Sequence, residues 1–325
     1  MMVVLARSPR PQPPRSDADS FKTDVLAGLR APQKHIPAKY FYDELGSQLF
    51  ERITEQPEYY PTRCEMSILR DRAGEIARLI TPGSAIVEFG SGSNKKARLL
   101  LQAAPALAAY VPVDISGEML EREAADLRAD FPELKVLPVA ADFTTGFDLP
   151  DEAQDAPRRI GFFPGSTIGN FEPPDAVEFL RNAGRILGRD GVLIVGADLV
   201  KPAEILNAAY DDAAGVTADF NLNLLTRINR ELGGTFDREG FAHRAFFNEA
   251  RSRIEMHLVS RRPQTVKVGS QAFAFRDGET IHTENSYKYS VESFAALARK
   301  VGWRPAGVWT DPAGYFSIQA FRLAP

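Results

Sequence analysis

IVEFGSGSNKK, residues 86–96, joins an apolar run, a Gly-x-Gly turn and a helical pattern. It predicts a buried strand, a tight turn and a helix, in that order. The turn calls for glycines because a positive φ and a close backbone approach to a ligand both leave no room for a Cβ atom. A single Gly-x-Gly is weak evidence for a cofactor site, so the interpretation depends on the segments that follow it.

The next predicted strand, residues 109–114, ends in Asp114. In doubly wound folds an acidic residue about 20 positions beyond the glycine turn binds ribose hydroxyls, and Asp114 stands near that spacing from Gly90 and Gly92. Residues 93–95 supply no third glycine, which a pyrophosphate-binding helix would need. The pattern therefore favours a nucleoside without a pyrophosphate, and S-adenosylmethionine is the obvious candidate.

Composition limits the class of protein. The 325 residues are 44% hydrophobic and 25% charged, with a net charge of −4, which is typical of a globular chain and argues against a nucleic-acid partner. The single cysteine, Cys64, excludes internal disulfides and suits the cytoplasm, where we expect the protein. The four histidines lack metal-ligand spacing, so no metal is expected. No stretch is long enough to span a membrane, and residues 1–19 are expected to form a disordered leader.

Strands and helices alternate over the middle of the chain. The alternation predicts a parallel, doubly wound α/β sheet, with strands at 84–89, 109–114, 135–139, 159–163 and 191–199 and helices at 65–80, 95–104, 116–128 and 175–187. A helix over 290–301 and an antiparallel hairpin of strands 304–310 and 315–321 then end the chain. This ending is typical of a class I methyltransferase, whereas a dehydrogenase would more often close with a parallel strand.

The alternation of strands and helices is absent from two other regions. After residue 201 the pattern predicts helices over 203–210 and 217–231 and then antiparallel strands at 241–247, 253–260, 264–268 and 273–275. Near the N-terminus we expect a helix over 21–30, capped by Ser20, and an aromatic-rich segment over 39–63 that is either a ligand wall or interdomain packing. We therefore predict a second, α+β substrate-binding or lid domain from residues 20–63 and 201–286, and a methyltransferase domain from 64–200 and 287–325.

Two polar segments follow predicted strands, at the sheet edge where open α/β sheets bind ligands. Asp142 could accept the adenine amine while Phe143 packs on the base, although an N-cap and a core phenylalanine are the alternative. Asn170 lies in a loop with two glycines and two hydroxyls, and its carbonyl could hold a substrate amine. Alternatively, Asn170 merely stabilises a turn.

Several motifs together resemble a known family. They are PEYYPTR (57–63), FPGSTIGN (163–170), YDD (210–212) with GVTA (215–218), NREL (229–232), RIEM (253–256) and TENS (283–286). The chain from about residue 21 to residue 321 resembles the L-histidine Nα-methyltransferases of ergothioneine biosynthesis. The resemblance implies S-adenosylmethionine-dependent conversion of L-histidine to its trimethylated form, hercynine, the first step of that pathway.

The resemblance also implies roles for individual residues. The residues that it places around the cofactor are Gly90, Gly92, Lys96, Asp114, Asp142 and Phe143. It places the substrate's α-amine and carboxylate at Asn170 and Tyr210, with a phenol from Tyr59 or Tyr60 and with Tyr42. Of these, Tyr42 and Asn170 are the candidate catalytic residues. The imidazole would be bound by Glu284 and Ser286, with Met256 lining the pocket.

These residue types suit the chemistry. An α-amine with a pKa of about 7.7–8.0 must lose a proton before it attacks, so neutral Tyr and Asn partners suit it better than carboxylates. Aromatic faces tolerate the trimethylated cation, which no longer donates hydrogen bonds. Glu284 and Ser286 favour imidazole over an apolar side chain, which would leave both unpaired, although a salt bridge is the alternative for Glu284.

Other readings remain open at this point. The same fold could act on another amino acid or small amine. A nucleotide-binding oxidoreductase is disfavoured by the missing third glycine, and a non-catalytic sensor of S-adenosylmethionine is disfavoured by the polar amine wall. We expect a small-molecule substrate, no nucleic acid and no membrane as partners. In the absence of cysteine pairs and coiled-coil heptads, we expect a monomer.

Overall fold

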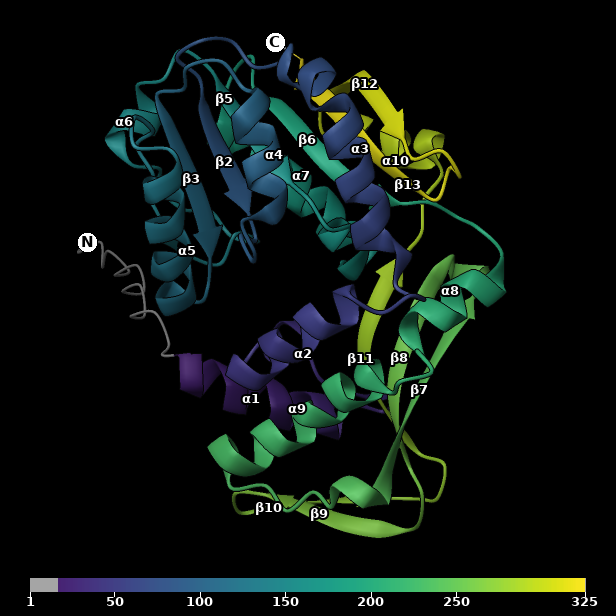
Figure 1. The fold of residues 1–325 in the computed structure, drawn as a ribbon. Helices are drawn as coiled ribbons and strands as arrows, with labels where there is room; N and C mark the ends of the chain where they lie inside the picture. The colour runs from purple at the N-terminus through teal and green to yellow at the C-terminus, as the bar shows by residue number, and fades with distance from the viewer. Residues whose placement is uncertain (1–16, 325) are drawn as a thin grey trace, which may run out of the picture.

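The computed structural model describes residues 17–324, and its largest element is a seven-stranded sheet (Figure 1). The strand order is β12-β13-β6-β5-β2-β3-β4, with β13 antiparallel to both of its neighbours and the other pairings parallel. The bounds are β2 (Ala85–Phe89), β3 (Ala109–Asp114), β4 (Val139–Ala140), β5 (Arg159–Phe163), β6 (Val192–Asp198), β12 (Trp303–Thr310) and β13 (Phe316–Leu323).

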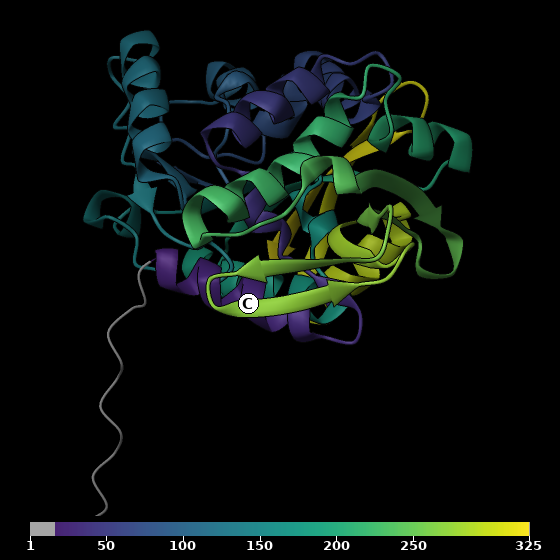
Figure 2. The ribbon, with the colours of Figure 1, turned by 90° about the horizontal axis from the view of Figure 1, so that it is seen from below.

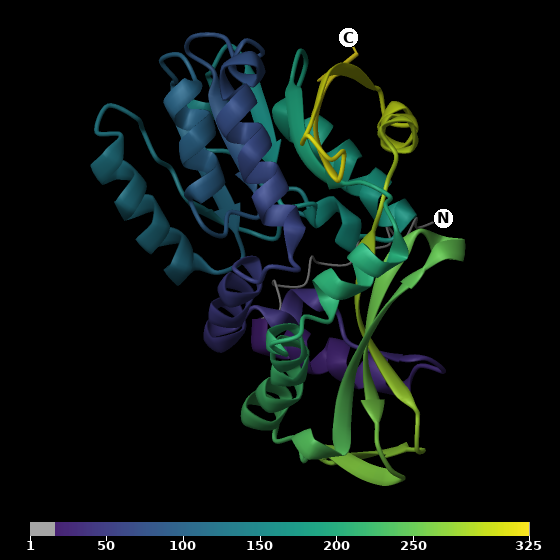
Figure 3. The ribbon, with the colours of Figure 1, turned by 45° about the vertical axis from the view of Figure 1, so that its right-hand side comes forward.

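Helices cover both faces of this sheet, as the continuous apolar character of its central strands requires. One apolar cluster joins Val87 and Phe163 to Phe179, and the other joins Ile86 and Ile160 on the opposite face. The flanking helices are α3 (Tyr60–Ala77), α4 (Lys95–Ala103), α5 (Gly117–Asp130), α6 (Asp151–Gln154), α7 (Pro173–Leu187) and α10 (Val291–Arg299). The carboxyl ends of β2 and β3 point toward the rest of the molecule (Figures 1 and 3).

A second, smaller set of elements lies at that edge (Figures 1 and 2). It has a four-stranded sheet in the order β1-β11-β8-β7 and a hairpin of β9 and β10. Its strands are β1 (Lys34–His35), β7 (Phe241–Asn248), β8 (Arg253–Ser260), β9 (Gln264–Val268), β10 (Gln271–Phe275) and β11 (Thr280–Tyr287). Its α-helices are α1 (Asp17–Arg30), α2 (Glu44–Thr54), α8 (Ala203–Tyr210) and α9 (Val216–Leu232). One apolar cluster runs through these elements, so they share a core.

Short 3-10 helices connect several of these elements. They are η1 (Ala38–Phe41), η2 (Thr167–Asn170), η3 (Arg238–Gly240) and η4 (Glu249–Arg251). The second of them, η2, follows β5 and contacts β11. Because β11 runs from the small sheet toward the large one, this contact joins the two parts of the molecule (Figure 1).

The aromatic-rich segment near the N-terminus is more helical than its sequence indicates. Residues 44–54 form α2, which begins where the Asp43 carboxylate accepts a hydrogen bond of 2.8 Å from the Gly46 amide. The following helix, α3, begins at Tyr60 rather than at residue 65, because Pro61 is tolerated in a first helical turn. At the other end of the segment, α1 begins at Asp17, so Ser20 lies inside the helix and the prediction that it is the N-cap is wrong.

Two strands differ from the prediction. The expected strand over 135–139 is reduced to a bridge between Tyr110 and Val136 and to the two-residue β4, because Pro138 has no N–H for the ladder. Conversely, the polar segment 280–287 was not predicted as a strand, yet it forms β11 at the centre of the small sheet.

Two expectations concern the ends of the chain and membranes. The predicted disordered leader falls mostly on residues 1–16, which lie outside the described part of the structure. Over residues 17–324, no helix combines the length and the apolar character that crossing a membrane requires.

Candidate functional site

The glycine turn follows β2 at the edge of the large sheet. Gly90 has a φ of +72°, and a Cβ atom there would lie 3.2 Å from the Phe143 ring, so a side chain would be both strained and crowded. The amides of Gly90 and Ser91 donate to the Val113 carbonyl at 2.9 and 3.0 Å, which ties the turn to β3. Around Gly92, by contrast, a Cβ atom would meet no described atom within 4 Å.

The acidic and aromatic cofactor candidates lie beside this turn. Asp114 ends β3, and its Oδ1 accepts a 2.9 Å hydrogen bond from the Ser116 amide, while burial raises its pKa above the usual range. Asp142 caps a turn, because its Oδ1 accepts from the Thr144 amide at 2.9 Å. The Phe143 ring packs edge-on against Phe163, with centroids 5.7 Å apart. The structure therefore brings the ends of β2 and β3 and the segment after β4 together.

Lys96 pairs with a carboxylate that the sequence analysis did not single out. Its ammonium lies 2.6 Å from Oε2 of Glu65, whose side chain is almost fully buried. The same carboxylate accepts the Gly165 amide at 2.9 Å. Glu65 thus connects α3, α4 and the loop after β5, and the ammonium still has donors left for a ligand.

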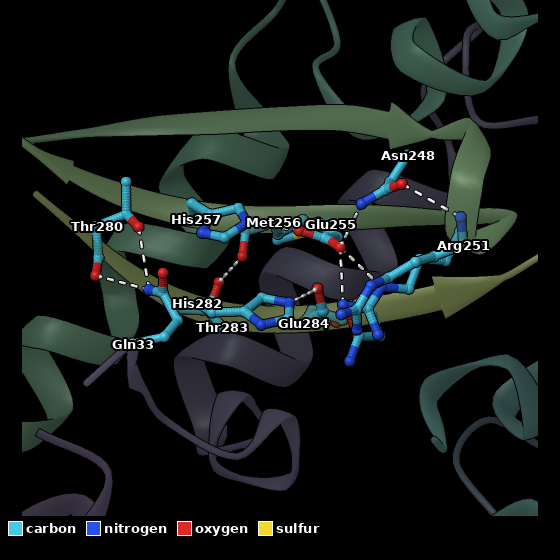
Figure 4. Close-up of polar contacts among 12 residues, drawn as sticks. Gln33, Asn248, Arg251, Glu255, Met256, His257, Thr280, His282, Thr283 and Glu284 are labelled. Carbon is cyan, nitrogen blue, oxygen red and sulfur yellow. Dashed lines mark hydrogen bonds and ion pairs between the residues drawn. The ribbon is translucent and has the colours of Figure 1, made fainter. Parts of the chain in front are cut away.

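On the small sheet, Met256 of β8 lies directly opposite Glu284 of β11 in the strand register. Ser286 is two residues further along β11 and therefore lies on the same face of the sheet as Glu284. Its hydroxyl is 2.7 Å from the phenol oxygen of Tyr210, which is at the end of α8. Four of the predicted substrate residues are therefore adjacent (Figure 4 shows Met256 and Glu284 on their strands).

Glu284 has the electrostatics of a ligand-binding carboxyl group. Desolvation raises its pKa to about 7, against the opposing charge of Lys288. No residue within 17–324 donates a hydrogen bond to its carboxylate, so the salt-bridge alternative does not hold there. A desolvated carboxyl group without a donor is unfavourable unless a ligand supplies one.

A network of buried charged side chains lies next to Ser286 and Tyr210. Asp198, at the end of β6, is 0% exposed, and its carboxylate accepts from the Tyr60 phenol at 2.6 Å. The ammonium groups of Lys201 and Lys288 lie 2.6 and 2.7 Å from the same carboxylate. Burial acts to raise the pKa of Asp198, but the two lysines outweigh it and hold that pKa below its usual range. Burial in turn lowers the pKa of Lys201 to about 8.

Lys288 links this network to the substrate candidates. Its ammonium donates to the Tyr210 phenol at 2.9 Å and to the Ser286 hydroxyl at 2.8 Å. Asp198, Lys201 and Lys288 were missed by the sequence analysis. The available signal was Asp198 itself, an acidic residue at the carboxyl end of a buried strand, where ligands bind in open sheets.

The two neighbouring tyrosines have different surroundings. The Tyr60 hydroxyl is bound to Asp198 and to Lys201 at 2.7 Å. The Tyr59 ring instead packs edge-on against Tyr210, with centroids 6.2 Å apart. Its hydroxyl has no hydrogen-bond partner among the described residues, and burial raises its pKa well above the usual range. Of the two phenols, the one on Tyr59 is therefore available to a ligand.

Tyr42 and Asn170, the candidate catalytic residues, approach the site from opposite parts of the molecule. Desolvation raises the pKa of the Tyr42 phenol, and the charges of Glu284 and Asp114 raise it further. Tyr42 is 41% exposed, and its side chain makes no hydrogen bond within the described residues. Asn170 ends η2, beside β11, and its side chain makes no hydrogen bond within the described part of the chain.

Comparisons with known proteins identify the family of the chain. A family model described as histidine-specific, S-adenosylmethionine-dependent methyltransferase matches residues 21–323. Histidine N-alpha-methyltransferase of Mycolicibacterium smegmatis is 41% identical over 93% of this chain and 95% of its own length. The protein of that name from Mycobacterium tuberculosis is 39% identical over 92% and 94%. Ergothioneine biosynthesis protein 1 of Neurospora crassa is 31% identical over 90% of this chain but only 34% of its own length.

Among solved structures, the CcbJ methyltransferase from Streptomyces caelestis matches 79% of this chain and 95% of its own, with 14% identity and a TM-score of 0.47. The predicted class I methyltransferase fold, with its terminal antiparallel hairpin, is confirmed. S-adenosylmethionine is the methyl donor of the matching family, as predicted, and the oxidoreductase alternative is excluded. The chain belongs to the family of histidine-specific, S-adenosylmethionine-dependent methyltransferases.

Proposed function

We propose that the protein transfers three methyl groups from S-adenosylmethionine to the α-amine of L-histidine and so forms hercynine, the first step of ergothioneine biosynthesis. The observation that carries this proposal is the unpaired Glu284 carboxyl group beside Ser286 and Tyr210. The names of the relatives, histidine N-alpha-methyltransferase and ergothioneine biosynthesis protein 1, support the substrate and the pathway.

The residues at the edge of the large sheet fit the cofactor. The open space at Gly92 leaves the backbone of the turn accessible to close approach, and Asp114 has a carboxylate oxygen left for ribose hydroxyls. We assign the adenine to Asp142 and Phe143, with Gly92 lining the turn. Lys96 would use its remaining donors for the carboxylate of the cofactor. When bound, the cofactor supplies a methyl group on a positively charged sulfonium, so the protein's task is alignment and the exclusion of water.

The imidazole of histidine would lie against Glu284, Ser286 and Met256. The carboxylate of Glu284 accepts an imidazole N–H, and this restores the hydrogen bond that the buried group lacks. The Ser286 hydroxyl can donate to or accept from the second ring nitrogen. An amino acid with an apolar side chain would leave both groups unpaired, which accounts for selection of histidine.

The α-amine and carboxylate would be held by neutral donors and acceptors. We assign them to Asn170, Tyr210 and Tyr42, with Tyr59 as the direct contact, since the phenol of Tyr60 is engaged by Asp198. The raised pKa values of these phenols keep them protonated, so the phenols themselves add no negative charge that would stabilise the ammonium form of the substrate. The amine therefore reaches its neutral, nucleophilic form more easily than it would beside carboxylates.

We also propose how the chain divides into domains, where the protein acts and in which oligomeric state. Residues 20–63 and 201–286 form the substrate-binding domain, and residues 64–200 and 287–325 form the methyltransferase domain. The shared core of the smaller part supports this division. The protein is proposed to act as a cytoplasmic monomer on histidine, without a metal in the transfer step and without nucleic-acid or membrane partners.

A second candidate is methylation of another amino acid or small amine. It is favoured by a 28% identical relative over 94% of this chain, 4-dimethylallyltryptophan N-methyltransferase easF of Aspergillus fumigatus. Mass spectrometry of purified protein incubated with S-adenosylmethionine and each amino acid in turn separates the two. A gain of three methyl groups on histidine alone supports the proposal. Transfer to another amine but not to histidine overturns the assignment of Glu284 and Ser286.

A further inference from the structure

The loop that carries Asn170 is in contact with β11, the strand of the proposed imidazole contact. Just before Asn170, the backbone of Gly169 packs directly on this strand, because a Cβ atom there would lie 2.8 Å from the Tyr287 carbonyl oxygen. Just after Asn170, Glu172 is the N-cap residue of α7, with an extended backbone. The Glu172 side chain does not cap its own helix and is free to bind elsewhere.

The Glu172 carboxylate accepts three hydrogen bonds from the small sheet. Its Oε1 atom accepts from Nη1 of Arg253 at 2.7 Å and from Nδ2 of Asn285 at 3.0 Å. Its Oε2 atom accepts from the Tyr287 phenol at 2.6 Å. One carboxylate at the edge of the large sheet thus binds two strands of the small sheet, β8 and β11. These four residues are called the Glu172 clamp below.

The partners of Glu172 are themselves held in place. The Nε and Nη2 atoms of Arg253 lie 2.8 and 2.7 Å from Oε1 of Glu255, and its Nη1 atom also donates to the Tyr287 phenol oxygen at 2.7 Å. Both Arg253 and Tyr287 are buried. A planar guanidinium that is bound on several sides has little freedom to follow a moving carboxylate. Glu172 therefore meets a rigid surface rather than flexible side chains.

The charges keep Glu172 ionised in the clamp. Burial acts to raise the pKa of Glu172, but the Tyr287 hydrogen bond and the charge of Arg253 outweigh it and hold that pKa below its usual range. The Glu172 side chain is 44% exposed, so solvent screens its ion pair with Arg253. The ion pair is therefore a weak source of overall stability, and its main consequence is the geometry that it imposes.

The clamp lies on the face of β11 opposite to the proposed imidazole contact. Because side chains alternate along a strand, Asn285 and Tyr287 point away from the face that carries Glu284. Beyond the end of β11, Lys288 lies 2.7 Å from Asp198 of the large sheet. A strand attached near one end can pivot about that attachment, whereas a second attachment fixes its direction. The clamp provides this second attachment.

We propose that Glu172 is a positioning residue for methyl transfer, which through Arg253 and Tyr287 sets where β11 holds the imidazole relative to Asn170 and the methyl donor. The inference rests on the proposed conversion of histidine to hercynine. Glu172 acts through the strand and touches neither the substrate nor the cofactor in that proposal. A misplacement of about 1 Å can slow a reaction by about a hundredfold, so a change in the direction of β11 should affect the rate.

The third transfer should depend most on the clamp. In each transfer the nitrogen lone pair takes the methyl group, and the electron pair of the broken C–S bond stays on sulfur. The product of the first two transfers loses a proton to solvent before the next one. The neutral dimethylated amine has no N–H left, so Asn170 can no longer orient it through a hydrogen bond. The position of its nitrogen then depends on where the imidazole end is held.

The test compares the unaltered protein with Glu172→Gln, using histidine and Nα,Nα-dimethylhistidine as separate substrates. The amide group of Gln cannot accept on both sides, so the clamp loses a hydrogen bond as well as the ion pair. We expect kcat for dimethylhistidine to fall by about tenfold, kcat for histidine to fall less, and KM to change by less than about twofold. Mass spectrometry of reactions on histidine should show dimethylhistidine accumulating. A smaller folded fraction would instead lower both rates equally.

Tyr287→Phe is the second variant, because it removes only the phenol oxygen from the clamp and should shift the two rates in the same direction. If both side chains act through the clamp, the double variant should lose no more activity than the more affected single variant. Multiplied losses would contradict a shared role. The matched control is Glu178→Gln, which removes an exposed carboxylate of the same helix, α7, whose partner Arg181 is on that helix. It should leave both rates unchanged.

The two proposals fail in different ways. If the unaltered protein forms no methylated histidine, the proposed function is overturned, and this inference with it. If the unaltered protein forms hercynine but the ratio of the two kcat values is the same in folded Glu172→Gln and Tyr287→Phe proteins as in the unaltered protein, this inference alone is overturned. Circular dichroism and urea unfolding establish that each variant is folded.

Discussion

The ammonium group of Lys288 donates a hydrogen bond of 2.9 Å to the phenol oxygen of Tyr210. Because that oxygen already accepts from Lys288, the Tyr210 hydroxyl hydrogen is directed toward other acceptors, which are the Ser286 hydroxyl and a substrate carboxylate. Lys288 therefore orients a proposed substrate contact without itself being in solvent, since its side chain is fully buried against Asp198. This relationship makes Lys288 a positioning residue in the proposed site.

Replacement of Lys288 by Met tests that role. The variant leaves the Tyr210 phenol free to rotate, so we expect KM for histidine to rise by about tenfold, the effect of losing about 1.4 kcal/mol. Stability should fall by about 3–5 kcal/mol, because one partner of a buried ion pair is removed. Steady-state kinetics and urea unfolding measure both. Lys95→Met is the control, since Lys95 forms only an exposed ion pair with Glu51. An unchanged KM in folded Lys288→Met protein would contradict the positioning role.

Glu284→Ala tests the proposed imidazole contact. Removing the carboxylate deletes a charge-assisted hydrogen bond worth about 1.5–3 kcal/mol, so histidine affinity should fall by about tenfold to a hundredfold. Cofactor affinity should be nearly unchanged, because the cofactor residues belong to the large sheet. Isothermal titration with histidine and, separately, with the cofactor measures the two effects. Equal losses for both ligands would count against the assignment of Glu284.

Glu88 predicts a pH dependence of stability. It is 2% exposed, its carboxylate accepts from the Tyr110 and Ser91 hydroxyls, and burial raises its pKa to about 7. Between pH 4.5 and 7 the folded protein holds a proton on Glu88 that the unfolded chain releases. The contribution of this group to stability is therefore greatest below pH 4.5 and declines, by about 3 kcal/mol, as pH rises through 7.

The Glu88→Gln variant isolates this contribution. Its free energy of unfolding, measured with urea from pH 5 to 8, should lack the decline that the unaltered protein shows. Glu133→Gln, at an exposed loop position, should retain that decline. A difference between wild type and Glu88→Gln that is constant over this pH range would show that Glu88 does not titrate there.

Elements with a signal in their own local sequence were predicted, whereas elements that depend on contacts with distant segments were not. The strands of the large sheet were predicted because apolar runs between turns report burial directly. By contrast, β11 was missed because the positions that face the proposed imidazole site carry Glu284 and Ser286, polar side chains that do not give the apolar alternation of a strand. The aromatic residues around α2 likewise concealed a helix, since their contacts with α9 lie far away in the sequence.

The side-chain pairings of the site could not be predicted, because they join segments that are distant in the sequence. The network of Tyr60, Asp198 and Lys288 joins three parts of the chain, and no spacing rule connects them. The pairing of Lys96 with Glu65 depends in the same way on how α3 packs beside α4. Motifs therefore identified which residue types the site contains, whereas the fold determined which of them are paired and which are left available.

The two adjacent tyrosines give the sharpest test of that distinction. Tyr59→Phe removes a hydroxyl that has no partner among the described residues, so stability should change little, while kcat/KM for histidine should fall by about tenfold. Tyr60→Phe removes a donor to the buried Asp198 carboxylate, so the protein should lose about 1–3 kcal/mol of stability. Urea unfolding and steady-state kinetics on both variants, each the control of the other, separate the roles. The reverse pattern would assign the substrate contact to Tyr60 and the structural hydrogen bond to Tyr59.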